Sequence, residues 1–291
     1  MTHHLITRET LDFEPLRKTQ SHKFSYGHAL VVSGGAGKTG AARLAARGAL
    51  RIGAGLVTLG VPPSAQMEVA GHITAIMLAR VEGAEGFDAV LQDRRLNDVC
   101  LGPGLGIERA RALVPVAVGH EGAPFVTLDA DALTAFADEP SELFRMLQCR
   151  CVLTPHGGEF ARLFPDIAEK LSASAVKGSA YSKVDATLEA AGRAGCVVLF
   201  KGPDTVIAGP DGRCRVHAAV GGRAAPWLAT AGAGDVLAGF ITGLMARGFD
   251  PMAAAETAAW LHVECARSFG PGLIAEDLPE EVPKVFRQLG L

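Results

Sequence analysis

Three small residues followed by an aspartate are the feature of this sequence best suited to chemistry. Gly232, Ala233 and Gly234 carry almost no side chain, so their backbone N–H groups can be presented to an anion. Asp235 follows, at the start of an apolar run that predicts a helix over 236–246. A carboxylate beside an anion cradle at a helix start suits phosphoryl transfer to a hydroxyl group. The segment alone fits equally well a glycine turn in which Asp235 is only the helix N-cap.

Two glycine-rich loops follow predicted strands elsewhere in the chain. The loop 33–40 fails the P-loop spacing, because the first glycine of that motif would have to stand where the sequence has Val32. It can still bring N–H groups close to a ligand. The loop 101–106 is too short for a dinucleotide fingerprint, and no acidic residue follows at the ribose-binding distance. Its glycines permit either a tight turn or the close approach of a flat ligand.

Acidic residues mark two further loops at strand ends. Asp129 and Asp131 follow a strand, where either could hold a cation or a sugar hydroxyl, although the pattern favours a helix N-cap. His156 stands in a Pro- and Gly-shaped loop, which favours a ligand contact over a structural role. Glu159 begins the next helix and could bind Mg²⁺ through water, or simply favour the helix dipole.

A cationic loop completes the set. Lys201 can neutralise phosphate charge and Thr205 can donate a hydrogen bond from its hydroxyl, whereas the alternative interpretation of 201–205 is a plain hairpin turn.

Alternation of short β-rich runs with longer amphipathic runs predicts the elements that would position these loops. The expected strands cover 28–33, 56–61, 73–79, 98–101, 124–128, 151–154, 196–201, 205–208 and 214–217. The expected helices cover 40–52, 107–118, 130–137, 158–164, 182–194, 236–246, 253–269 and 279–288. This order predicts an α/β fold with a mostly parallel sheet, helices on both faces, and antiparallel strands toward the C-terminal edge. We expect one domain over 1–291, with 1–26 as an arm or lead-in helix.

Composition narrows the class of protein. With 291 residues, 48% hydrophobic and 20% charged, the chain has an ordinary globular composition. A net charge of −3 gives no reason to expect nucleic acid or an anionic membrane surface. The sequence shows neither a membrane span nor a signal-peptide core, and its six scattered cysteines suggest reduced, buried thiols. We therefore expect a cytoplasmic protein; a metal or redox role for Cys149 and Cys151 is the weaker alternative.

Taken in order, these loops resemble the NAD(P)H-hydrate dehydratase family of the ribokinase-like superfamily. The matching segments are 40–58, 102–106, 128–133, 153–160, 201–205 and 231–237, which together span almost the whole chain. The resemblance implies a ribokinase-like fold and repair of the S epimer of hydrated NADH or NADPH. The hydroxyl at C6 would be phosphorylated by ADP or ATP with Mg²⁺, and phosphate would then be eliminated. Because the chain has no room for the epimerase domain that often accompanies this family, the resemblance implies a stand-alone dehydratase working beside a separate epimerase.

The resemblance also implies roles for individual residues. Asp235 would be the base, with Gly232, Ala233 and Gly234 cradling the phosphoryl group. The nucleotide would be held by Lys201, Gly202, Pro203, Asp204, Thr205 and Gly234. The hydrate would contact Ala41, Gly104, Gly106, His156 and Asp235, and Glu159 matches the acidic Mg²⁺ position.

Three residues depart from the family pattern. Gly157 stands where a proline is usual, Ala233 replaces a Ser or Thr, and Trp227 is bulkier than the residue normally found before the anion cradle. The first could loosen the His156 loop, and the last could alter the fit of the substrate.

Two other functions remain open from the sequence. A ribokinase-like kinase for a vitamin precursor or sugar would use Asp235 in the same way. A non-catalytic nucleotide-binding protein would need no base beside the glycines. The Ala-rich run 253–269 fits either a subunit contact in a homo-oligomer or a core helix.

Overall fold

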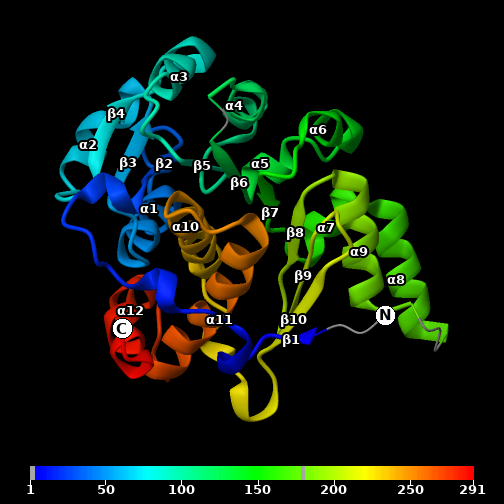
Figure 1. Cartoon of the computed structure of the whole chain (residues 1–291). Helices are drawn as coiled ribbons and strands as arrows, with labels where there is room; N and C mark the ends of the chain where they lie inside the picture. Colours follow the sequence, from blue (N-terminus) through cyan, green and yellow to red (C-terminus); the bar gives the residue numbers. More distant parts are fainter. Residues whose placement is uncertain (1–3, 123, 178–180) are drawn as a thin grey trace.

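A single ten-stranded sheet runs through the molecule, with helices on either side of it (Figure 1). The computed structural model describes residues 4–122, 124–177 and 181–291. The strand order is β1-β10-β9-β8-β7-β6-β5-β2-β3-β4. Strands β2 to β8 pair in parallel, whereas β9 runs antiparallel to both β8 and β10. The predicted mostly parallel sheet with antiparallel strands toward the C-terminal edge is confirmed.

The strands lie close to their predicted positions. They are β1 (His4–Leu5), β2 (His28–Val32), β3 (Leu56–Val61), β4 (Met77–Arg80), β5 (Asp98–Leu101), β6 (Phe125–Leu128), β7 (Cys151–Leu153), β8 (Val197–Phe200), β9 (Asp204–Ala208) and β10 (Cys214–Ala218). The prediction for β4 began four residues too early, and β1 was not predicted. This two-residue strand pairs in parallel with β10, so the arm carries an edge strand followed by 3₁₀ turns instead of a lead-in helix.

The helices include four that the sequence analysis missed. They are α1 (Gly40–Arg51), α2 (Gln66–Ala70), α3 (Gly83–Leu91), α4 (Ile107–Gly119), α5 (Asp131–Thr134), α6 (Pro140–Met146), α7 (Gly157–Leu163), α8 (Pro165–Lys177), α9 (Lys183–Ala194), α10 (Ala233–Ala246), α11 (Pro251–Phe269) and α12 (Asp277–Leu289). The missed helices are α2, α3, α6 and α8. Of the predicted ones, α5 ends three residues early and α10 begins three residues before its predicted start.

Side chains of the central strands alternate between two cores. Leu30 and Val32 of β2 pack with α3 to α7 and α9, whereas Ala29 and Val31 of the same strand pack with α1. Helices α10, α11 and α12 cover the neighbouring part of that second face. The predicted helices on both faces are therefore confirmed. Fully buried apolar strands are typical of a parallel sheet covered on both sides.

Close packing of α1 against α10 aligns the starts of both helices at one edge of the sheet. A Cβ at Gly239 would lie 2.1 Å from the carbonyl oxygen of Ala45, and one at Gly243 would lie 2.6 Å from that of Ala49. Glycine at these two positions lets the backbones approach. Helix α11 is also an internal element, because most of its residues are buried within this chain. The suggested subunit contact through this helix is therefore not supported.

The cysteines, the possible metal ligands and the helix hydropathy bear on three further expectations from the sequence. Cys100, Cys151, Cys196, Cys214 and Cys265 are buried free thiols, whereas Cys149 is exposed, which corrects the expectation that all six are buried. No group of three or more His, Cys, Asp or Glu residues arranged for a metal occurs within the described part of the chain. In the same part, no helix combines the length and hydropathy needed to cross a bilayer.

A buried carboxyl group at the start of β5 makes stability depend on pH. Asp98 is fully buried, and neither of its side-chain oxygens has a hydrogen-bond partner. Burial raises the pKa of Asp98 well above its ordinary value. Its contribution is therefore most favourable below the pKa of the unfolded chain and is lost as pH rises toward the folded-state pKa.

We expect Asp98→Asn to be more stable than the unmodified chain at pH 8 by about 1–3 kcal/mol, because asparagine avoids the cost of the raised pKa, about 1.4 kcal/mol for each unit. The difference should shrink toward pH 4, where the aspartate is neutral. Urea unfolding at both pH values measures it. An equal free-energy difference at pH 4 and pH 8 would show that Asp98 does not titrate on unfolding.

Candidate functional site

Lys201 joins loops from four different elements at the carboxyl edge of the sheet. Its Nζ lies 2.8 Å from Oδ1 of Asp129, which follows β6, and 3.8 Å from Oε2 of Glu159 in the first turn of α7. A Cβ built on Gly234, in the first turn of α10, would lie 3.4 Å from the same Nζ. Residues that the sequence placed in separate loops therefore meet around one ammonium group.

Asp235 stands in the first turn of α10 but does not cap it. The N-cap is Gly232, in a left-handed conformation with φ of 89°, so the N-cap interpretation of Asp235 is wrong. Burial, and after it the nearby Asp129 carboxylate, raise the pKa of Asp235 to about 6 against the opposing effect of Lys201. A carboxyl group of this pKa is largely ionised at neutral pH and can accept a proton.

Unpaired amides surround Asp235 at the helix start. The Ala233 N–H donates to the carbonyl oxygen of Thr230 at 3.4 Å, and the first helical hydrogen bond comes from the N–H of Val236. The N–H groups of Gly234 and Asp235 have no backbone or side-chain acceptor among the described residues. Such free amides at a helix N-terminus form an anion site.

Lys201 remains charged despite its burial. Burial acts to lower the pKa of Lys201, but the carboxylates of Asp129, Glu159 and Asp235 outweigh that effect and raise it. Asp129 itself is 1% exposed. The following residue, Ala130, has φ of 46° and ψ of −114°, an unfavourable conformation for alanine. The strained backbone therefore occurs beside the buried ion pair.

The two aspartates after β6 make specific contacts instead of capping a helix. Asp129 pairs with Lys201, and Asp131 Oδ2 accepts a hydrogen bond of 2.8 Å from the Gly106 N–H. The N-cap position of α5 is Ala130. The favoured N-cap interpretation of these residues is therefore wrong, and Asp131 ties the 101–106 loop to the β6 loop.

The predicted substrate glycines lie beside α1. A Cβ at Gly104, which has φ of 61°, would lie 3.4 Å from Cβ of Ala41 and 2.8 Å from the carbonyl oxygen of Lys38. A Cβ at Gly106 would meet open space. The structure thus brings Ala41 and Gly104 together at the carboxyl ends of β2 and β5.

His156 and Glu159 form a reciprocal cap at the start of α7. The Nδ1 atom of His156 accepts hydrogen bonds from the N–H groups of Gly158 (2.9 Å) and Glu159 (3.3 Å). Oε2 of Glu159 accepts from the His156 N–H at 2.8 Å. His156 therefore has the structural role that the sequence analysis disfavoured, while its half-exposed ring still faces solvent. Glu159 is 5% exposed and also lies near Lys201.

Gly157 occupies the first helical position of α7, where proline is favoured. Its φ is not positive, a Cβ there would meet no atom within 4 Å, and His156 before it is extended with ψ of 174°. We expect Gly157→Pro to raise the free energy of unfolding by about 0.4–1 kcal/mol, because proline restricts the unfolded chain. Denaturant unfolding measures this, with Gly192→Pro inside α9 as the control expected to destabilise. A lower stability for Gly157→Pro would contradict the placement of Gly157 at the first helical position of α7.

A hollow of about 620 Å³ opens beside Lys201 and Gly234. Its lining also includes Gly202, Pro203 and Thr205, three of the other residues predicted to hold a nucleotide. Asp204 is not part of it, because its carboxylate pairs with Lys183 at 3.4 Å on the surface.

Most of the hollow is walled by residues that sequence reasoning did not identify. They are Ala219, Val220, Gly221, Ala224, Ala225, Pro226, Leu228, Ala229, Leu237, Ala259, His262 and Val263, and the predicted cradle residue Ala233 lines the hollow beside them. His262 of α11 has a pKa lowered to about 4 by burial, and its Nε2 lies 2.8 Å from the carbonyl oxygen of Ala233, so the neutral ring donates that hydrogen bond. The apolar composition of the segment 219–229 was the one feature of the sequence that could have pointed to this wall. Trp227 does not line the hollow and is 48% exposed.

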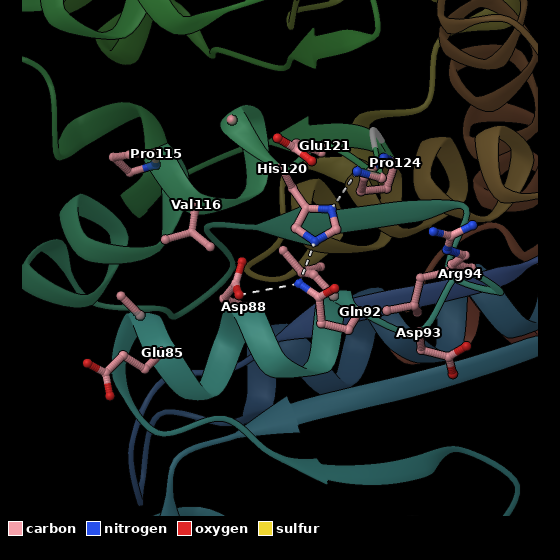
Figure 2. Close-up of a pocket in the computed structure, with 15 residues that line it drawn as sticks. Glu85, Asp88, Gln92, Asp93, Arg94, Pro115, Val116, His120, Glu121 and Pro124 are labelled. Atoms are coloured by element: carbon pink, nitrogen blue, oxygen red, sulfur yellow. Dashed lines mark hydrogen bonds between the residues drawn. The ribbon is translucent and has the colours of Figure 1, made fainter.

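A larger hollow, of about 1120 Å³, lies elsewhere, between α3 and α4 (Figure 2). Nε2 of Gln92 lies 3.4 Å from Oδ2 of Asp88 and 3.3 Å from Nε2 of His120 there. Its lining includes Leu96 and Pro124, just before β5 and β6. It is therefore at the amino ends of the strands, and none of the predicted site residues lines it.

A family model described as NAD(P)H-hydrate dehydratase matches residues 29–284. This chain belongs to the NAD(P)H-hydrate dehydratase family. It is 37% identical to a bifunctional NAD(P)H-hydrate repair enzyme of Moorella thermoacetica, over 94% of this chain and 52% of that protein. It spans about half the length of the bifunctional relatives it matches.

Other relatives match along their full length. An ADP-dependent (S)-NAD(P)H-hydrate dehydratase of Xanthomonas campestris is 32% identical over 98% of this chain and 96% of its own. The ADP/ATP-dependent dehydratase of Bacillus subtilis, co-crystallised with ATP and Mg²⁺, superposes with a TM-score of 0.76 at 30% identity over 99% of each chain. A ribokinase-like protein of Enterococcus faecalis superposes with a TM-score of 0.77 at 20% identity, covering 96% of this chain and 95% of that one. The expected ribokinase-like fold is confirmed.

Proposed function

We propose that this chain dehydrates the S epimer of hydrated NADH or NADPH at the expense of ADP or ATP. The observation that carries the proposal is that Gly234, whose amide is free, and Lys201 line the 620 Å³ hollow, with Asp235 next to them. Family membership supports the substrate class, and the Xanthomonas and Bacillus relatives carry that activity in their names.

The proposed chemistry has two steps. Asp235 accepts the proton of the C6 hydroxyl, whose oxygen attacks the terminal phosphorus while the bond to the nucleotide's bridging oxygen breaks, leaving AMP or ADP. The phosphate ester then loses phosphate from C6 and a proton from the neighbouring carbon, which restores the ring double bond. The amides at the start of α10 and the Lys201 ammonium stabilise charge on the transferring group.

The nucleotide is proposed to occupy the hollow lined by Lys201, Gly202, Pro203, Thr205 and Gly234. Its base fits against the apolar 219–229 wall. Asp204 contributes only through its backbone, because its side chain is turned to Lys183. The hydrate is proposed to lie on the other side of Asp235, against Ala41, Gly104, Gly106 and the exposed ring of His156.

Mg²⁺ fits the charge of this site. Asp129, Glu159 and Asp235 bring three carboxylates near a single ammonium group. The excess negative charge favours a cation that arrives with the nucleotide. Mg²⁺ usually keeps several waters and uses few protein carboxylates. Glu159 would hold it, through water, since one Glu159 oxygen already accepts the His156 N–H. When bound, the ion neutralises charge on the phosphates.

The decisive experiment incubates the chain with hydrated NADH and ADP or ATP and follows recovery of the reduced-nicotinamide absorbance. Recovery with release of free phosphate supports the dehydratase; a stable phosphorylated product would instead indicate a small-molecule kinase, and nucleotide binding without turnover a non-catalytic protein. Comparing ADP with ATP, and hydrated NADH with hydrated NADPH, decides the preferred pair. Adding a separate epimerase should extend recovery to the other epimer.

A further inference from the structure

A third hollow, of about 680 Å³, is lined by several basic side chains at the opposite end of α1 and α10. Its lining, here called the basic pocket, includes the cationic side chains of Arg17, Lys18, Arg47, Arg51 and Arg247, and the imidazole of His72. Arg51 ends α1 and Arg247 directly follows α10, whereas the first turns of these helices carry Ala41 and Gly234. Helices of 12 and 14 residues are about 18 and 21 Å long. The basic pocket is therefore separate from the candidate site.

Carboxylates neutralise only part of this charge. Glu280 accepts hydrogen bonds from Nε of Arg47 at 2.5 Å and from Arg51. Glu14 pairs with Arg17 at 3.1 Å. Arg47 and Arg51 each use one guanidinium nitrogen in the contact with Glu280. Their other N–H groups have no acceptor among the described residues. Such donors suit phosphate, which arginine binds through paired hydrogen bonds.

Two further cations, Lys18 and Arg247, both lie close to the Tyr26 ring, and neither has a carboxylate partner among the described residues. Nζ of Lys18 and the guanidinium of Arg247 lie 4.9 and 5.3 Å from the centre of the Tyr26 ring. Burial and the adjacent Arg247 lower the pKa of Lys18. Arg247 has a structural role, because it donates to the carbonyl oxygens of Gly53 (2.9 Å) and Pro15 (2.7 Å). No comparable contact explains Lys18 within the described residues, and an anion would relieve the repulsion.

The rest of the pocket is apolar. The nonpolar side chains in its lining are Leu16, Leu50, Ile73, Ala75, Ile76, Pro283, Phe286 and Leu291. A ligand that fits both parts carries negative charge at one end and an apolar or aromatic group at the other. We infer that the basic pocket binds a phosphate-bearing ligand of the nucleotide class, at a site distinct from the proposed catalytic one.

Calorimetric titration with ADP and with inorganic pyrophosphate tests this inference. The background is the Lys201→Ala chain, in which the candidate site is weakened. Adding Lys18→Ala and Arg51→Ala should weaken ADP binding at least tenfold, since two cationic contacts are lost. The control is Lys23→Ala, an exposed lysine of the same arm outside the pocket, which should leave binding unchanged. ADP should bind more tightly than pyrophosphate, because only ADP can use the apolar lining.

Hydrogen exchange on the chain with Lys201 intact gives a second, site-resolved readout. ADP should protect amides of 16–18 and 72–76, and the Lys18→Ala/Arg51→Ala double variant should lose that protection while protection at 201–205 persists. Unchanged ADP affinity in the double variant, absence of protection at 16–18, or equal affinity for pyrophosphate and ADP would overturn the inference. So would a change in assembly mass in the double variant, which would make the pocket a chain–chain contact.

This inference stands apart from the proposed function. The double variant leaves the candidate site intact, so its hydrate turnover at saturating nucleotide should equal that of the unmodified chain. Loss of ADP binding at the pocket with unchanged turnover supports the inference, whatever the fate of the dehydratase proposal.

Discussion

Asp235→Asn is expected to lower kcat for hydrate dehydration by about 10²–10⁴-fold, the usual contribution of a general base. The amide keeps the shape of the side chain but cannot accept the proton of the hydroxyl group. In the unmodified chain, kcat should rise with pH through about 6, the pKa to which burial and Asp129 bring Asp235. Turnover of hydrated NADH measured from pH 5 to pH 8 provides both tests.

Stability separates loss of the base from loss of the fold. Because the folded-state pKa of Asp235 is raised, its contribution is present below the unfolded-state pKa and lost as pH rises through about 6. At pH 8, Asp235→Asn should therefore unfold with a free energy equal to or up to about 3 kcal/mol above that of the unmodified chain. Unchanged turnover in this variant would refute the base assignment. An inactive variant that is also less stable at pH 8 would point to misfolding.

Lys201→Ala is expected to raise KM for the nucleotide about 10- to 100-fold, the worth of one charge-assisted hydrogen bond. It should also destabilise the chain by about 3 kcal/mol, because it leaves the buried Asp129 carboxylate without its partner at 2.8 Å. Since Lys201 acts to lower the pKa of Asp235, its removal should move the rise of kcat to higher pH. Initial rates over pH and nucleotide concentration measure both effects.

Lys183→Ala is the matched control for Lys201. Lys183 lies beside the same loop and pairs with Asp204 at 3.4 Å, but it does not line the hollow. Its removal should leave the pH profile unchanged. If Lys183→Ala shifted the profile as far as Lys201→Ala, the effect would be general electrostatics; if neither did, Lys201 would not act on Asp235.

The relation between stability and activity at this site follows from its charges. Asp129, Glu159 and Asp235 lie close enough to affect one ammonium, and Asp129 disfavours the ionised form of Asp235. The burial and the repulsion from Asp129 that cost stability also bring the pKa of the base close to neutral pH. Replacing Asp235 should thus stabilise the protein while abolishing its proposed chemistry, a common trade-off in active sites.

The sequence by itself determined most of the strand positions, β1 and the start of β4 excepted, together with the mostly parallel sheet and the edge at which polar loops gather. Buried strands such as β2 are continuous apolar runs, so their pattern is local and readable. Parallel strands connected by helices place their carboxyl ends together, which made the loops after β6, β7 and β8 joint candidates.

Only the tertiary structure decided what the individual polar residues contact. An aspartate or histidine near a glycine fits a cap, an ion pair or a ligand contact equally well from local sequence. In the structure, His156 caps α7, and Asp129 accepts a hydrogen bond from Lys201, 72 residues away in the sequence. It also supplied His262 from α11 to the wall of the hollow. These roles depend on long-range packing, and no short segment of the chain carries that information.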